Sequence, residues 1–170
     1  LPAALAAAER EGATGRELIA AHVVGCEVHY RVGKGCSYPE HYLEGWHYTG
    51  TLGVFGATAA AASILGLPRE EVHNALGIAA SSSAGLRKNN GSHTKPYHAG
   101  DAAQRGVRAA VLADAGFTSD DDIFEGELGY GEVYSPREYE PEHITEPLGE
   151  EWSVLDVGFK LHPGGTINDG

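Results

Sequence analysis

The spacing of apolar side chains predicts that helices make up most of the chain. Residues 1–10, which are rich in Ala and Leu, form the first expected helix, and Gly12 ends it. Thr14 and Glu17 have the spacing of a capping box, which places the start of a second helix at this point. Apolar positions then recur every three or four residues until the glycine-rich break at residues 33–35, where this helix is expected to end.

The most apolar part of the chain follows a segment that is expected to be a loop. Residues 36–47 contain a proline and several aromatic side chains, whereas residues 49–65 are uncharged and dense in Gly and Ala. A membrane span is one interpretation of the second segment, but Thr51, Thr58 and Ser63 lower its hydropathy and it is short for a bilayer. The preferred interpretation is a helix that is buried on all sides, because small residues let neighbouring helices approach closely.

Further helices are predicted in the middle of the chain. Pro68 suits the first turn of a helix, and apolar side chains follow it at helical spacing. Residues 81–91 are polar and form a loop or a helix end. Another helix is expected from about residue 98 to residue 115, with Gly116 as its C-terminal cap. A short acidic helix is expected to end at Asp122.

The pattern changes towards the C-terminal end. Residues 126–147 are poor in apolar side chains and rich in Tyr, Glu and Pro, so they are expected to be irregular surface chain. Residues 152–161 have the composition of a β-strand. The fold class predicted is therefore mainly α, with residues 1–150 in a helical domain and residues 151–170 at the start of a second domain.

Charge and cysteine content narrow the function classes. The formal net charge of -12 argues against a nucleic-acid partner, which would need a basic surface. The acidic surface fits a salt-adapted protein and an ordinary acidic cytoplasmic protein equally well. Cys26 and Cys36 are too few to hold an iron–sulfur cluster within this chain, and a disulfide between them is not expected in a cytoplasmic enzyme. The chain has no Met and no signal-peptide pattern, and we interpret it as an internal piece of a longer protein.

Two segments carry the most promising chemistry. His47 lies between Trp46 and Tyr48 in a glycine-containing segment, and an imidazole titrates near neutral pH, so His47 could give or take a proton. Thr94 and Lys95 precede a predicted helix, where a lysine can hold a carboxylate against the positive end of that helix. The alternative interpretations are a structural histidine and a solvated lysine.

Other polar residues give weaker signals. His98 either joins Lys95 at a substrate or only caps the turn, and Lys160 at the end of the predicted strand is either a ligand contact or an edge lysine that favours solubility. The remaining histidines lack the spacing of metal ligands, so no metal site is predicted. No phosphate-binding loop, dinucleotide fingerprint or nucleophilic serine elbow occurs in the sequence.

With these motifs in place, the chain closely resembles the MmgE/PrpD family, whose members include 2-methylcitrate dehydratase, cis-aconitate decarboxylase and an iminodisuccinate epimerase. The matching segments occur in the family's order along the chain at residues 1–12, 45–51, 94–100 and 159–163. The resemblance implies an all-helical domain followed by an α+β lid domain. It also implies a homodimer that acts on small di- and tricarboxylates without a metal or a cofactor, in the cytoplasm and without nucleic-acid or membrane partners.

The resemblance also assigns roles to individual residues. By position, His47 matches an active-site histidine of the family, Lys95 matches an active-site lysine, and Lys160 matches a lysine of the lid; Thr94 and His98 are expected to contact the substrate. The family's upstream Asp- and His-bearing motif would precede Leu1. Gly165 stands where some members carry a histidine, which weakens a decarboxylase assignment most.

The function expected from the sequence is a hydro-lyase of the 2-methylcitrate dehydratase type, as in propionate metabolism. An epimerase of the iminodisuccinate type and a cis-aconitate decarboxylase are alternatives on the same scaffold. A different class of alternative is a non-catalytic piece that only binds carboxylates or dimerises.

Overall fold

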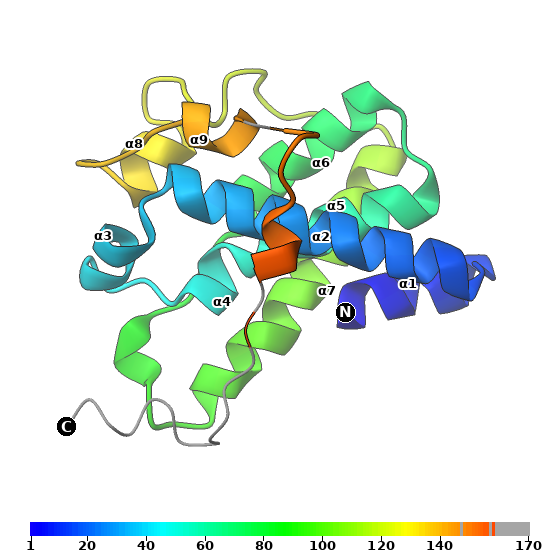
Figure 1. Ribbon diagram of the computed structural model, residues 1–170, viewed down its shortest axis with the longest axis horizontal. Helices are drawn as coiled ribbons and strands as arrows, with labels where there is room; N and C mark the ends of the chain where they lie inside the picture. Colours follow the sequence, from blue (N-terminus) through cyan, green and yellow to red (C-terminus); the bar gives the residue numbers. More distant parts are fainter. Residues whose placement is uncertain (147, 157, 159–170) are drawn as a thin grey trace.

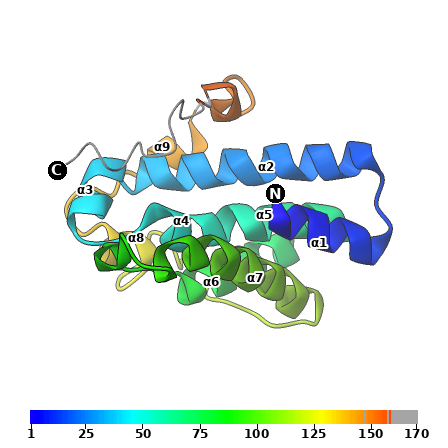
Figure 2. The same ribbon diagram turned by 90° about the horizontal axis from the view of Figure 1, so that it is seen from below.

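The computed structural model describes residues 1–146, 148–156 and 158, and within these residues it is helical, as the sequence predicts (Figure 1). The elements in chain order are α1 (Pro2–Glu11), α2 (Gly15–Gly35), α3 (Tyr38–Leu43), α4 (Tyr48–Thr51), α5 (Gly53–Leu65), α6 (Arg69–Ser82), the 3₁₀ helix η1 (Arg87–Asn89), α7 (Thr94–Asp114), α8 (Tyr130–Tyr134), α9 (Glu142–Thr145) and the 3₁₀ helix η2 (Ser153–Asp156). Viewed from below, α2 covers one face of α5, while α6 and α7 lie on the opposite side (Figure 2).

The predicted boundaries of the first two helices are confirmed. Gly12 ends α1 in the left-handed conformation with φ 67°, which costs little for a residue without Cβ. At the start of α2, the backbone N–H of Glu17 donates to Thr14 Oγ1 at 3.3 Å and the backbone N–H of Thr14 donates to Glu17 Oε2 at 2.7 Å. This reciprocal capping box satisfies two N–H groups that the helix itself leaves without partners.

The apolar segment forms the core, which confirms the preferred interpretation of a buried helix. It is divided at Leu52 into α4 and α5, and Val54 and Phe55 are fully buried. By length and composition the stretch Tyr48–Leu65 would be apolar enough to cross a membrane, but 61 % of it is buried inside the protein. Helices of a soluble core have the same composition, so the contacts of α5 account for its low polarity.

Glycines bring the helices on both sides close to α5. A Cβ atom on Gly25 of α2 would lie 2.6 Å from the carbonyl oxygen of Gly56, and one on Gly56 would lie 2.5 Å from the carbonyl oxygen of Gly25. On the other side, a Cβ on Gly106 of α7 would lie 2.4 Å from the Cβ of Ala57. The backbones of α2, α5 and α7 therefore lie so close together that larger side chains would not fit at these positions.

Three local predictions in the middle of the chain are wrong. Residues 36–47 contain the helix α3, which Pro39 permits because it occupies the first turn. Helix α7 begins at Thr94 rather than near residue 98, because Pro96 also lies in a first turn, where its missing N–H costs no intrahelical bond. Residues 119–122 form turns instead of a short helix, and the backbone N–H of Ser119 donates to the side chain of Asn74 at 2.9 Å.

The strand predicted for residues 152–161 is also wrong where the structure describes it, because Ser153–Asp156 form the 3₁₀ helix η2. This segment is held by side chains of α2. The backbone N–H of Val154 donates to Glu27 Oε2 at 3.1 Å, and Lys34 Nζ donates to Ser153 Oγ at 2.9 Å. Residues 153–156 are therefore held by side chains of α2 and not by pairing with a β-strand. The domain boundary near residue 150 stays a prediction.

Candidate active site

The segment that carries His47 is fixed by backbone contacts to the chain after α6. His47, the N-cap of α4, donates its backbone N–H to the carbonyl oxygen of Gly85 at 3.1 Å, and Arg87 donates to the carbonyl oxygen of Gly45 at 2.8 Å. A Cβ on Gly50 would lie 2.4 Å from the carbonyl oxygen of Ala84. The two segments are thus packed backbone to backbone, which leaves the position of His47 little freedom.

His47 is paired with His98. Their Nδ1 atoms lie 2.8 Å apart, and the residues are only 8 % and 6 % exposed. One Nδ1 must donate a hydrogen and the other must accept it. Within the part of the chain that the structure describes, the ring of His47 is hydrogen-bonded through Nδ1 and not through Nε2. The structure brings together two predicted site residues that are 51 positions apart.

Lys95 lies in the first turn of α7, one turn before His98, so both side chains project from the same side of that helix. Burial lowers the pKa of His47 below its ordinary value, and the neighbouring imidazole of His98 and the ammonium group of Lys95 lower it further. His47 is therefore neutral near pH 7 and has a lone pair with which to accept a proton. Lys95 is half-buried, which makes its charge more effective than that of a solvated lysine.

The stretch of chain that leads to His98 lacks acidic side chains although the chain as a whole is acidic. No Asp or Glu occurs between Glu71 and Asp101, the stretch that carries Arg87, Lys88 and Lys95. Carboxylates of a substrate would therefore meet no fixed negative charge from this segment. The arrangement suits an anionic ligand.

The structure says less about the roles of the other predicted site residues. Thr94 is exposed at the start of α7, and a contact with substrate stays a prediction. Lys160 lies outside the described residues, so its role also stays a prediction. In residues 1–146, 148–156 and 158, no three His, Cys, Asp or Glu side chains are grouped so that they could hold a metal ion.

His41, which no motif in the sequence singles out, proves to be part of the support for the site. It is fully buried, its Nδ1 lies 3.2 Å from the carbonyl oxygen of Tyr134, and its Nε2 lies 2.7 Å from Thr51 Oγ1. Because Nδ1 faces a carbonyl, Nδ1 carries the hydrogen and Nε2 accepts one from Thr51. Burial lowers the pKa of His41 to about 4. The one available signal in the sequence was its position among aromatic residues.

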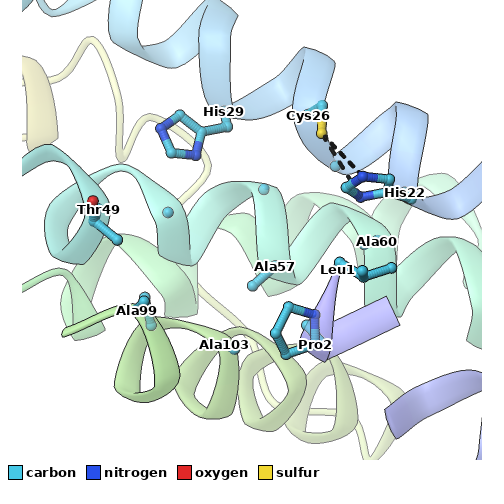
Figure 3. A pocket seen from close by; sticks show the side chains of 15 residues that line it. Leu1, Pro2, His22, Cys26, His29, Thr49, Ala57, Ala60, Ala99 and Ala103 are labelled. Atoms are coloured by element: carbon cyan, nitrogen blue, oxygen red, sulfur yellow. Dashed lines mark hydrogen bonds between the residues drawn. The ribbon is translucent and has the colours of Figure 1, made fainter. Parts of the chain in front are cut away.

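A cavity of about 210 Å³ lies between the start of α1 and the helices α2, α5 and α7. Figure 3 shows His22, Cys26 and His29 projecting from α2, with Thr49 and Ala99 at one end. Its wall is otherwise made mostly of Gly and Ala, and it does not include His47, Lys95 or His98. The cavity therefore does not form the candidate active site.

The fold and this site define a helical domain with a buried imidazole pair next to a lysine, and comparisons with known proteins give its family. The model of the MmgE/PrpD N-terminal domain matches residues 1–142. The chain belongs to the MmgE/PrpD family. The resemblance stated from the motifs is thereby confirmed.

Several similar proteins carry the names of cis-aconitate decarboxylase or 2-methylcitrate dehydratase. The chain is 32 % identical to a cis-aconitate decarboxylase-like protein of Aspergillus oryzae over 178 residues, which cover 95 % of this chain and 36 % of that protein. It is 32 % identical to cis-aconitate decarboxylase of Homo sapiens over 152 residues, 88 % of this chain and 31 % of the human protein. It is 35 % identical to 2-methylcitrate dehydratase of Escherichia coli K12 over 109 residues, 61 % of this chain and 18 % of the dehydratase. The chain spans about a third of the length of the decarboxylases.

Proposed function

We propose that the protein containing this chain is a lyase that moves a proton at a carbon next to a carboxylate of a small di- or tricarboxylate. The observation that carries the proposal is the His47–His98 pair with Lys95 beside it. Dehydration of the 2-methylcitrate type is the first candidate reaction. As in the family resemblance, the proposal includes no metal and no cofactor.

In this proposal the two kinds of side chain do different work. Lys95 holds a carboxylate of the substrate near the N-terminal end of α7, where backbone N–H groups also favour negative charge. Neutral His47 takes the proton from the adjacent carbon through Nε2. The electron pair spreads onto the carboxylate, where the charge of Lys95 stabilises it. It then forms the new C=C bond as the hydroxyl takes the proton back from His47 Nε2 and leaves as water. Lys160 is expected to hold a second carboxylate, as the resemblance implies.

Decarboxylation of cis-aconitate is the second candidate. It is favoured by the extent of the matches, because the decarboxylases align with 88–95 % of this chain and the dehydratases with 61 %. Loss of CO₂ leaves an electron pair on carbon, which a proton donor must neutralise. His47 in its protonated form would serve that purpose.

The test uses the full-length protein with 2-methylcitrate, citrate and cis-aconitate. Alkene absorbance reports dehydration, CO₂ release reports decarboxylation, and proton NMR in deuterated water reports exchange without a new alkene, the mark of an epimerase. His47→Ala should lower turnover of the accepted substrate by about 10²-fold or more while circular dichroism stays unchanged. Undiminished turnover in that variant would sink the proposal. Activity on no carboxylate would favour a non-catalytic role.

A further inference from the structure

The contact between His47 and His98 restricts where the protons of the pair can be. The two Nδ1 atoms are 2.8 Å apart and both rings are buried. A hydrogen bond between two imidazoles needs one N–H donor and one nitrogen without hydrogen. Only one of the two Nδ1 atoms therefore carries a hydrogen. The other ring accepts that hydrogen through its Nδ1, and when this ring is neutral its single N–H is on Nε2.

The chemistry proposed for His47 decides between the two arrangements. Once Nε2 of His47 has taken a proton, both nitrogens of that ring carry hydrogen, so Nδ1 must donate. His98 can then only accept through an Nδ1 without hydrogen. The opposite arrangement would set two N–H groups against each other at 2.8 Å, which would oppose protonation of His47.

We propose that His98 is a positioning residue whose bare Nδ1 holds His47 in the tautomer that leaves Nε2 free to take the substrate proton. The inference rests on the function proposed for His47. In the transfer step the C–H bond breaks and its electron pair stays on the carbon next to the carboxylate. The proton forms the new Nε2–H bond of His47, whose Nδ1–H is kept and donates to His98. This role differs from the substrate contact predicted for His98 from the sequence.

The backbone around the pair fixes the positions of the two rings relative to each other. A Cβ on Gly85 would lie 3.5 Å from Nδ1 of His98, and the carbonyl oxygen of Gly85 accepts the backbone N–H of His47 at 3.1 Å. Gly85 therefore binds the backbone of His47 and leaves little space for a side chain next to His98. Because His98 lies within the 21-residue helix α7 and His47 is tied to Gly85, the contact does not depend on a flexible loop tip.

The test compares His98→Asn with His98→Gln in the full-length protein. The amide of Asn reaches about the position of Nδ1 and can accept the hydrogen bond, whereas the longer Gln places its amide near the position of Nε2. The same two substitutions at His93, which is exposed just before α7, are matched controls. The readouts are kcat/KM with the accepted substrate and the tautomer of His47 from ¹⁵N NMR of histidine-labelled protein.

We expect wild-type His47 to carry its hydrogen on Nδ1. His98→Gln should lower kcat/KM about 10-fold or more and shift His47 towards the Nε2–H tautomer, while His98→Asn should keep kcat/KM within about threefold. The His93 variants should match the wild type. An Nε2–H tautomer in wild-type His47 overturns the inference, as do Asn and Gln variants with equal kcat/KM and an unchanged tautomer. Normal turnover in His47→Ala instead overturns the proposed function, so the two failures are distinguishable.

Discussion

His41 and His47 are buried histidines six residues apart, and the structure gives them different surroundings. Both nitrogens of His41 are bonded to groups that never change charge, the carbonyl oxygen of Tyr134 and the hydroxyl of Thr51. His47 instead shares one nitrogen with a second imidazole and lies within the field of Lys95. Burial alone therefore does not distinguish a catalytic histidine. The partners of its nitrogens do.

The two regions are also connected. Thr51 Oγ1 lies 2.7 Å from His41 Nε2 and 3.3 Å from the carbonyl oxygen of His47. The ring of His41 stacks with that of Tyr48, the residue after His47, at a centroid distance of 5.8 Å. His41 thus supports the turn on which His47 is presented, while taking no part in the chemistry we propose.

The largest expected effect on stability concerns His41. Its pKa in the folded protein is about 4, below the value of about 6.5 for a solvated histidine, so its stabilising contribution is complete above pH 6.5. As the pH falls towards 4, the unfolded state takes up a proton before the folded state does. This difference corresponds to roughly 3 kcal/mol lost between pH 6.5 and 4.

Urea unfolding of the full-length protein at several pH values measures this loss. His41→Asn should flatten the decline in unfolding free energy below pH 6.5, because the titrating group is gone. His93→Asn, at an exposed histidine, is the control and should keep the wild-type decline. Parallel declines in the wild type and the His41 variant would mean that His41 is not the buried neutral group described here.

The next largest expected effect is on catalysis, and it concerns Lys95, the residue near His47. Lys95→Met keeps the length of the side chain and removes its charge, so kcat/KM for the accepted carboxylate should fall about 10- to 100-fold. Unfolding free energy should change little, since the residue is only half-buried. Lys88→Met, at an exposed lysine of the same segment, is the matched control. Equal effects of the two substitutions on kcat/KM would remove Lys95 from the site.

The smallest effect is expected from removal of metal ions. Dialysis of the full-length protein against EDTA should leave turnover within about twofold, because imidazole and ammonium groups supply the proton transfer and the charge stabilisation proposed here. Restoration of a lost activity by a divalent cation would show that the account of His47 and Lys95 is incomplete.

The parts of the fold that depend on local chemistry could be predicted from the sequence. The capping box of Thr14 and Glu17 and the glycine stop at residue 12 need only neighbouring residues, and both are confirmed. The start of α7 could not be placed, because Pro96 is compatible both with a helix start and with a loop before one. The segment at Ser153–Asp156 has the composition of a strand but binds side chains of α2, which no local pattern reveals.

The same distinction applies to the site. His47 and Lys95 could be proposed from their motifs, since these residue types suit the chemistry of carboxylic acids. Their arrangement could not, because the pairing of His47 with His98 depends on packing between α4 and α7. Both His41 and His47 lie near aromatic residues in the sequence, and the supporting role of His41 becomes visible only from its hydrogen-bond partners.

The most direct test is to make His47→Asn and His41→Asn in the full-length protein and measure turnover and unfolding free energy in each. We expect the two variants to show opposite profiles. His47→Asn should lose about 10²-fold or more of turnover with little loss of stability, while His41→Asn should lose stability at neutral pH and keep the turnover of its folded fraction. Turnover that survives in His47→Asn, or that collapses in folded His41→Asn, would contradict it.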